Sequence, residues 1–333
     1  MGNDIIDSIK SLNKNAIIKI LQYSDEKQQQ LFSIAREMRN NGKFGKKVEL
    51  RSVIELSNIC SQKCNYCSIS KDKDSFYTLE KESVIERISQ LADIGRKTFL
   101  LQSGENNNKK FIENVAYCCN KSIEKYPDLR IILCMGNLSY AQYKLLRESG
   151  ASRYILKFET SNSEHHKFCR PTDSIENRLN HIKMLIDLGF KVGSGNIVGL
   201  PEQTFENLYE DLVLINKIDL TMVSATRFIS NPRSVFRIYE NGDLNLTLNY
   251  LAILRILKPD ALIPSTTSLA SRGVNGQLNG LLAGCNTVTI HDGTPDEFQQ
   301  KYSIYSPKRF SPNEQYCRDI VTQCNLQPVP YLI

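Results

Sequence analysis

The stretch Glu55-Leu-Ser-Asn-Ile-Cys-Ser-Gln-Lys-Cys-Asn-Tyr-Cys-Ser68 contains three cysteines, Cys60, Cys64 and Cys67, at the spacing C-x3-C-x2-C. It comes directly after an apolar run, Val48–Leu56, which predicts a buried strand. Cysteine thiolates are the usual ligands of iron–sulfur clusters, and a cubane has four irons. Three cysteines leave one iron without a protein ligand, as a catalytic zinc site keeps one open position. The pattern therefore predicts a cluster that acts on a bound molecule.

Two other interpretations of the three cysteines are open. They could be a zinc site that lacks its fourth ligand, or three buried thiols. Zinc is poorly supported because the first histidine after the cysteines is His165. Buried thiols are poorly supported because Ser61, Gln62, Lys63 and Asn65, which lie between the cysteines, are polar.

From Val48 onward, short apolar runs alternate with amphipathic segments that end in Gly or Pro. The runs predicted as strands are Val48–Leu56, Thr98–Gln102, Arg130–Cys134, Arg153–Phe158, Lys191–Val198, Met222–Phe228, Ala261–Pro264 and Thr287–Ile290. Strands that alternate with helices predict a parallel sheet with crossover connections. Eight such strands predict an α/β fold, a (β/α)8 TIM-type barrel.

In such a barrel the chemistry lies at the carboxyl ends of the strands. The three cysteines follow the first predicted strand. Other polar or glycine-containing motifs follow four further strands, namely Ser103-Gly104-Glu105, Glu159-Thr160, Gly199-Leu-Pro-Glu202 and Thr266-Thr267. All these groups should therefore share one rim.

The chain divides into three predicted parts. Residues 1–45 carry apolar side chains at helical spacing and predict an N-terminal helical cap. Residues 46–310 form the barrel, and residues 311–333 form a short C-terminal tail.

Composition narrows the class of protein. The net charge is +6, but the basic residues are scattered, so no nucleic-acid site is expected. The sequence contains no run of eighteen apolar residues, so no membrane helix is expected. The acidic N-terminus does not resemble a signal peptide. We expect a cytoplasmic protein with reduced cysteines. Four of them are read as small apolar core residues, namely Cys118, Cys119, Cys169 and Cys285.

The cysteine loop, with Tyr66 before its third cysteine, resembles the cluster loop of the radical S-adenosylmethionine (SAM) enzymes. In that superfamily three cysteines hold a 4Fe–4S cluster, and the amino and carboxylate groups of SAM chelate the fourth iron. One electron then cleaves the sulfonium and gives a 5′-deoxyadenosyl radical. The resemblance implies that Cys60, Cys64 and Cys67 hold the cluster and that Tyr66 contacts the adenine.

Further stretches resemble SAM-binding motifs of the superfamily. Ser103, Gly104 and Glu105 match the loop that binds the SAM amino group. Glu159 matches an acidic residue that holds the ribose hydroxyls, and Arg178, in Glu176-Asn-Arg178, matches an arginine near the SAM carboxylate. A last stretch matches the motif that backs the adenine. It is Gly195-Asn-Ile-Val-Gly-Leu-Pro-Glu202 and includes Gly199 and Leu200.

Residues 45–310 are most similar to the biotin-synthase-like group, and within it to the FeFe-hydrogenase maturases of the HydE type. This resemblance implies a small-molecule or organometallic substrate inside the barrel. It also implies an electron donor such as a ferredoxin or flavodoxin, further maturation proteins as partners, and an anaerobic setting. The positions matching the substrate cavity are Lys157, Met222, Thr266, Thr267 and Tyr302.

The sequence departs from these relatives at several positions. Biotin synthases hold a second cluster in the barrel; Cys134 matches one of its cysteines, but Gly193 stands at another and Thr266 lies near its arginine. Sulfur insertion is therefore not expected. Lys157 replaces a HydE arginine and loses the planar fork of a guanidinium. Cys317 and Cys324 are too few for a second cubane and are expected to bind nothing.

HydE-type maturation is therefore the first functional hypothesis. A rearrangement enzyme of the methylornithine synthase type is the second, although the neutral Ser265-Thr-Thr-Ser268 argues against it. An iron–sulfur protein that senses redox state or iron is a non-enzymatic third.

Overall fold

The computed structural model describes residues 2–69, 75–270, 275–302, 304 and 310–333. The longest strand, β1, leads directly into the cysteine loop, and ten of its eleven residues are buried. Such continuous burial is typical of a parallel strand that is covered on both faces. The strands are β1 (Lys47–Ser57), β2 (Thr98–Ser103), β3 (Arg130–Cys134), β4 (Arg153–Ile155), β5 (Lys191–Val198), β6 (Met222–Arg227), β7 (Thr287–Ile290) and β8 (Gln327–Val329).

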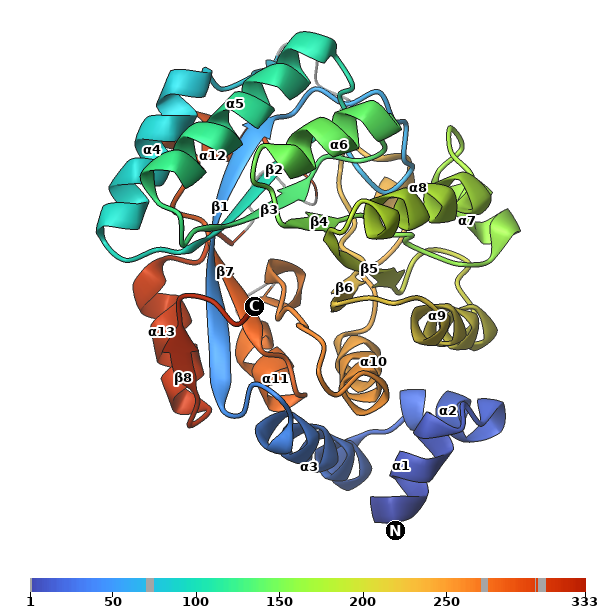
Figure 1. Ribbon diagram of the computed structural model, residues 1–333. Helices are drawn as coiled ribbons and strands as arrows, with labels where there is room; N and C mark the ends of the chain where they lie inside the picture. The colour runs from blue at the N-terminus through green and yellow to red at the C-terminus, as the bar shows by residue number, and fades with distance from the viewer. Residues whose placement is uncertain (1, 70–74, 271–274, 303, 305–309) are drawn as a thin grey trace.

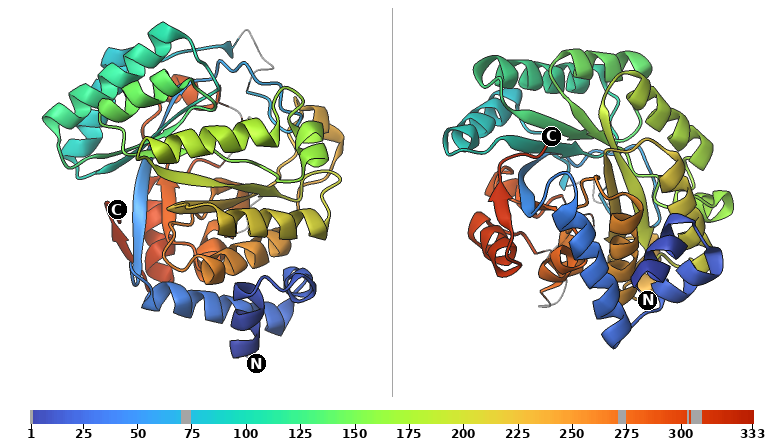
Figure 2. Two further views of the ribbon diagram at one scale, coloured as in Figure 1. Left: turned by 45° about the vertical axis from the view of Figure 1, so that its right-hand side comes forward. Right: turned by 60° about the horizontal axis from the view of Figure 1, so that its bottom comes forward.

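The strands form one parallel sheet in the order β6-β5-β4-β3-β2-β1-β7. The predicted α/β barrel and its N-terminal helices are confirmed (Figure 1). Two further views show that helices surround the curved sheet (Figure 2). Because all the strands run in the same direction, their carboxyl ends meet on one rim. The cysteine loop and the motifs that follow the other strands therefore lie on this rim.

The predicted seventh strand, Ala261–Pro264, is wrong as a regular strand. Leu262 makes an isolated bridge to Met222 of β6, and Pro264 makes one to Thr287 of β7. The segment closes the ring between β6 and β7 through irregular hydrogen bonds, such as Leu262 N to Thr221 O at 3.0 Å and Asn286 N to Ile263 O at 2.9 Å. Proline explains part of the difference, because it has no N–H to donate to a ladder.

Two other strand predictions need correction. The fourth strand was expected to reach Phe158 but ends at Ile155. The chain leaves the extended conformation just beyond, where Glu159 has a φ of +71°. The last strand, β8, was not predicted; it pairs with β1 from Lys47 to Glu49.

Helices cover the outside of the sheet, and most begin at a side-chain N-cap such as Ser139, Ser174 or Thr204. The α-helices are α1 (Gly2–Lys10), α2 (Lys14–Leu21), α3 (Asp25–Asn41), α4 (Lys81–Asp93), α5 (Lys109–Lys125), α6 (Tyr140–Glu148), α7 (Ser163–Cys169), α8 (Ile175–Asp187), α9 (Phe205–Lys217), α10 (Leu244–Leu257), α11 (Gly276–Leu282), α12 (Asp296–Gln299) and α13 (Glu314–Gln323). Two 3-10 helices complete the set, η2 (Val235–Ile238) and η3 (Thr267–Ala270).

The N-terminal helices lie at the end of the barrel where β1 begins, opposite the cysteine loop (Figures 1 and 2). Gln28 of α3 donates to the Oδ1 atom of Asn249 on the buried helix α10, at 2.9 Å. At the same end, Leu332 N–H donates to the buried carboxylate of Glu49 at 2.8 Å. Both ends of the described chain therefore pack against the floor of the barrel.

The division into a cap, a barrel and a tail at residues 45 and 310 stays a prediction. Among the described residues, none of the helices combines the length and apolar character that crossing a membrane requires.

Candidate active site at the cysteine loop

The cysteine loop begins where β1 ends and is bound to the loop that follows β2. Gly104 N–H donates to Ser57 O at 3.0 Å, and Ser61 N–H donates to Glu105 O at 2.9 Å. Glu105 N–H lies 3.3 Å from Cys60 Sγ. A Cβ atom on Gly104 would lie 2.7 Å from Cys60 Cβ, which is closer than carbon atoms approach. Glycine at position 104 therefore lets the two loops pack directly against each other.

The other side of the cysteine loop is bound to α7 and η2. Asn65 N–H donates to Cys169 O at 2.9 Å, and the Asn65 side chain donates to Phe168 O at 2.7 Å. Phe236 N–H donates to Asn65 O at 3.0 Å. The loop is thus fixed by hydrogen bonds on both sides.

Electrostatic interactions with Cys64 place both Cys60 and Cys67 near it, although no group of three or more His, Cys, Asp or Glu side chains among the described residues is arranged as a metal site. Cys64 is buried, and Cys60 and Cys67 are half-buried. Burial, with a smaller contribution from Cys64, raises the pKa of the Cys67 thiol to about 12; burial also raises that of Cys60. Arg170 Nη1 donates to Cys64 Sγ at 3.2 Å. Thiolates are the ligands of iron, so a guanidinium at one sulfur and a hydrophobic surrounding suit a bound cluster.

Glu105 is the centre of a hydrogen-bond network beside the cysteines. Its Oε1 atom accepts from Gln62 Nε2 at 2.5 Å, and its Oε2 atom accepts from Asn137 N at 2.8 Å. Arg178 Nη1 lies 3.8 Å from Oε2. Gly136, at a φ of +76°, leaves room for this carboxylate, because a Cβ there would lie 2.6 Å from Glu105 Cβ. The predicted SAM residues Glu105 and Arg178 are therefore brought together.

Two arginines and one aspartate extend this network. Asp173 Oδ2 lies 3.1 Å from Arg170 Nη2 and 3.4 Å from Arg178 Nε. Burial alone would raise the pKa of Asp173, but the two guanidinium groups outweigh burial and lower it to about 2. The aspartate therefore stays ionised and orients both arginines. All three side chains are nearly inaccessible to solvent, so their electrostatic interactions are weakly screened.

Tyr66 lies between the cysteine loop and the motif that follows β5. Its hydroxyl accepts from Arg170 Nη1 at 3.1 Å. Its ring packs against a cluster that includes Ile197, Leu200 and Phe228. Tyr66 and Leu200, both predicted to contact adenine, thus belong to one apolar surface.

Gly199 shapes the turn after β5. Its φ is +83°, and a Cβ there would collide with Gly242. Gln203 closes the turn, because its Oε1 accepts from Gly199 N at 2.8 Å and its Nε2 donates to Ile197 O at 2.9 Å. The glycine is therefore required both by the backbone angle and by the close packing.

Glu159 sits on a strained backbone. A φ of +71° is rare for a residue with a side chain, and such strain gathers at functional sites. The residue is held by main-chain bonds to β5, with Glu159 N donating to Gly195 O at 3.0 Å. Lys157 Nζ lies 2.9 Å from Glu159 Oε2 and donates to Thr226 Oγ1 at 3.0 Å. The predicted ribose and substrate residues are thus directly linked.

The other predicted cavity residues are distributed along the barrel. Met222 lies lower, where its Sδ is 3.9 Å from Arg51 Nη2. Tyr302 is buried, and burial raises the pKa of its hydroxyl well above the usual value. Thr267 begins η3, and Thr266 Oγ1 lies 2.8 Å from Ser268 Oγ.

Sequence reasoning missed several members of the site. Arg170, Asp173 and Asn137 lie in loops and helix ends whose partners are distant in sequence. His166 was also missed; it is buried, and within the described part of the chain neither of its ring nitrogens has a hydrogen-bond partner. Burial, then the charge of Arg170, lowers the pKa of His166 to about 4, so the imidazole is neutral near pH 7.

Comparison with known proteins decides the family. A family model of the radical SAM superfamily matches residues 54–215. The [FeFe] hydrogenase maturase subunit HydE of Thermotoga maritima is 33% identical over 312 residues, which are 92% of this chain and 88% of that protein. This chain belongs to the radical SAM superfamily. As a radical SAM enzyme it uses a 4Fe–4S cluster and SAM.

Other relatives come from neighbouring groups of this superfamily. The 3-methylornithine synthase of Methanosarcina acetivorans is 27% identical over 86% of this chain and 81% of that protein. The biotin synthase of Corynebacterium jeikeium is 26% identical over 86% of this chain and 81% of that protein. A crystal structure of methylornithine synthase covers 98% of this chain and 97% of its own with a TM-score of 0.83 at 23% identity, which supports the fold.

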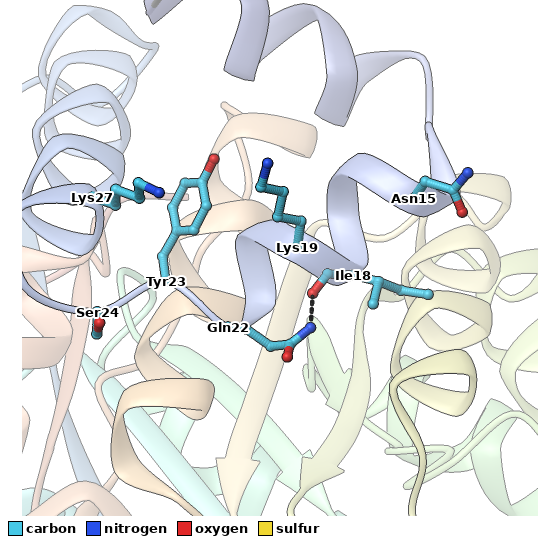
Figure 3. Close-up of a pocket in the computed structure, with 7 residues that line it drawn as sticks. All are labelled: Asn15, Ile18, Lys19, Gln22, Tyr23, Ser24 and Lys27. Atoms are coloured by element: carbon cyan, nitrogen blue, oxygen red, sulfur yellow. Dashed lines mark hydrogen bonds between the residues drawn. The ribbon is translucent and has the colours of Figure 1, made fainter.

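A pocket of about 340 Å³ lies away from this site, on the N-terminal helices. It lies between α2 and the start of α3, and Lys19, Lys27 and the Tyr23 ring border it (Figure 3). Gln22 Nε2 donates to Ile18 O at 2.9 Å beside it, as the dashed line shows. It contains no member of the cysteine network and is not the radical SAM site.

Proposed function

We propose that Cys60, Cys64 and Cys67 hold the cluster and that the network around Glu105 and Arg178 holds SAM. When bound, cluster and SAM together supply a 5′-deoxyadenosyl radical. The donor set supports this assignment, because three adjacent cysteines face a polar network and an apolar surface on one rim. The protein contributes binding and orientation, and the cofactors contribute the difficult bond cleavage.

The surrounding residues have separable tasks in this proposal. Arg178 orients the SAM carboxylate, because a guanidinium can bind a carboxylate through two parallel hydrogen bonds. Glu105 and the main chain of Ser103 and Gly104 form the surface for the SAM ammonium. Gln62 and Asn137 hold the Glu105 carboxylate in one orientation.

The other end of SAM is assigned to three residues. Glu159 accepts hydrogen bonds from the ribose hydroxyls, and Lys157 fixes the orientation of that carboxylate. Leu200 and Tyr66 provide an apolar surface for the adenine. The strained backbone of Glu159 supports a functional reason for its position.

We propose that the enzyme carries out HydE-type maturation of the FeFe-hydrogenase cofactor. The single observation that carries this is the 33% identity to a HydE over 92% of the chain. The substrate itself, organometallic or otherwise, is part of the proposal.

A second candidate is a rearrangement of the methylornithine synthase type. The relatives that favour it cover most of the chain at lower identity. The loop Ser265–Ser268 carries no acidic group for an amino-acid substrate, which weighs against it. Biotin synthesis is not proposed, because Gly193 supplies no thiol at the position that matches a cysteine ligand of the second cluster, and a Cβ there would be tightly packed, 3.0 Å from Met222 Cβ.

Maturation can be tested directly. The reconstituted protein should replace HydE in an anaerobic in vitro maturation of apo-hydrogenase, measured as hydrogen evolution. The Cys64→Ala variant is the matched control, because it lacks one cluster ligand. SAM cleavage without any hydrogenase activation would contradict the HydE-type assignment, and formation of 3-methylornithine would support the second candidate.

A further inference from the structure

An exposed surface adjoins the cysteine loop and has no role in the site described above. It consists of three apolar side chains, Phe168, Val235 and Ile238, and three basic ones, Lys63, Lys167 and Arg237. We call these six residues the loop face. Ile238 is 80% exposed and Val235 is 50% exposed, although both are aliphatic and belong to the same short helix, η2. Exposed apolar side chains with a charged border are typical of interaction sites.

The loop face is directly connected to the cluster ligands. Asn65, which lies next to Cys64, donates to Phe168 O and accepts from Phe236 N. The rings of Phe168 and Phe236 are 5.0 Å apart. Short covalent and hydrogen-bonded paths therefore lead from the surface to the cysteine loop.

The charge of the loop face selects the kind of partner. Within residues 163–172 and 231–240 and at Lys63, the exposed basic side chains are Lys63, Lys167, Arg233 and Arg237. The exposed acidic ones there are Glu164 and Glu240. The surface is thus basic overall, and it would attract an acidic protein over long distances.

We propose that the loop face is the docking site of a small acidic one-electron carrier protein that reduces the cluster. Electron transfer weakens steeply with distance, so the carrier has to bind close to the cysteine loop. One electron leaves the carrier, for example as flavin hydroquinone becomes semiquinone, and the cluster gains it without any bond or proton being exchanged. A small apolar centre with a charged border fits the weak, transient interfaces of redox partners. The inference rests on the radical SAM activity and not on the HydE-type assignment.

Two variants with matched controls test this proposal on the anaerobically reconstituted enzyme. Ile238→Glu and Arg237→Glu change the loop face. The controls are Ile94→Glu and Lys217→Glu, which make the same changes at exposed positions where α4 and α9 end, at the opposite rim. The probe is an acidic flavodoxin in its hydroquinone state. Its Kd is measured by calorimetry at two salt concentrations, and 5′-deoxyadenosine formation is measured with flavodoxin and with dithionite.

We expect both loop-face variants to weaken flavodoxin binding by about tenfold and to reduce the salt dependence of Kd. Flavodoxin-driven formation of 5′-deoxyadenosine should fall in parallel, while the dithionite-driven rate and both controls stay unchanged. Three results would overturn the proposal. These are unchanged Kd in both variants, an equal loss with dithionite, and sedimentation showing that the wild type is a dimer which the variants dissociate. The last result would mean that a second copy of the chain covers the loop face.

Discussion

Replacing Gly104 by alanine should separate cluster binding from folding. A Cβ at this position would lie 2.7 Å from Cys60 Cβ and closer still to Ile59 O. Ordinary van der Waals contact begins at 3.4 Å, so the cysteine loop has to move by at least about 0.7 Å to clear Cys60 Cβ, and by more to clear Ile59 O. Both neighbours belong to the backbone of the cysteine loop or to its Cβ, so no flexible side-chain end can yield instead.

The expected cost follows from this displacement. Overpacking of this kind costs about 1 to 3 kcal/mol of unfolding free energy. With an unfolding entropy of about 2.1 cal/mol/K per residue, a chain of 333 residues should lose about 1 to 4 °C in Tm. The effect on the cluster should be larger, because metal–ligand distances tolerate only about 0.2 Å. We expect a folded protein with a small fraction of the wild-type iron content.

Gly189→Ala is the matched control. Gly189 has a φ of +76° and no atom within 4 Å of an added Cβ, so alanine there costs about 1 to 2 kcal/mol through the backbone alone. Both variants are compared by thermal unfolding, by iron content and by the EPR signal of the reduced cluster. Gly189→Ala should lose stability and keep its cluster. If Gly104→Ala keeps full iron content and the wild-type rate of SAM cleavage, the direct packing of the two loops is refuted.

Four further changes give distinct readouts. Cys64→Ala should abolish 5′-deoxyadenosine formation and weaken the brown cluster absorbance; normal cleavage would mean that the ligands are misassigned. Arg170→Gln removes a positive donor 3.2 Å from Cys64 Sγ, so an EPR redox titration should find the cluster potential lower by about 60 mV, the one-electron equivalent of a tenfold change. Lys157→Ala should weaken SAM binding about tenfold in calorimetry by releasing Glu159, and Lys157→Arg should restore it. Burial raises the pKa of Asp211 to about 7, so the folded state favours the neutral acid. The free energy of unfolding should therefore fall as the pH rises from about 4 to 7. In urea titrations at several pH values, Asp211→Asn should show a flatter dependence of this free energy on pH than the wild type.

The sequence predicted the rim of the barrel well because local patterns determine it. The apolar runs that became β1, β2, β3, β5, β6 and β7 are continuous and bounded by glycine or polar residues. The loops after β1 and β2 therefore came together as expected, with Glu105 beside Cys60. Position on a strand end was sufficient to place these residues.

Sequence reasoning failed where long-range contacts override local pattern. Ala261–Pro264 has the composition of a strand, but its pairing depends on two neighbours and on a proline that cannot donate. Gln327–Val329 has too short a pattern to predict, and pairing with β1 creates the strand β8. Arg170 was missed because its sulfur partner is 106 residues earlier in the chain. Side-chain networks of this kind become visible only when the fold is known.

The closure between β6 and β7 has a consequence for how the molecule fluctuates. Leu262 and Pro264 each supply a single bridge, yet Leu262 N donates to Thr221 O at 3.0 Å and Ile263 N donates to Asn286 Oδ1 at 2.7 Å. Both residues are fully buried. Amide protons whose bonds break only in a large opening exchange slowly, so those of Leu262 and Ile263 should exchange with deuterium about as slowly as those at the centre of β1. The barrel would then resist opening at this junction although the segment forms no regular strand.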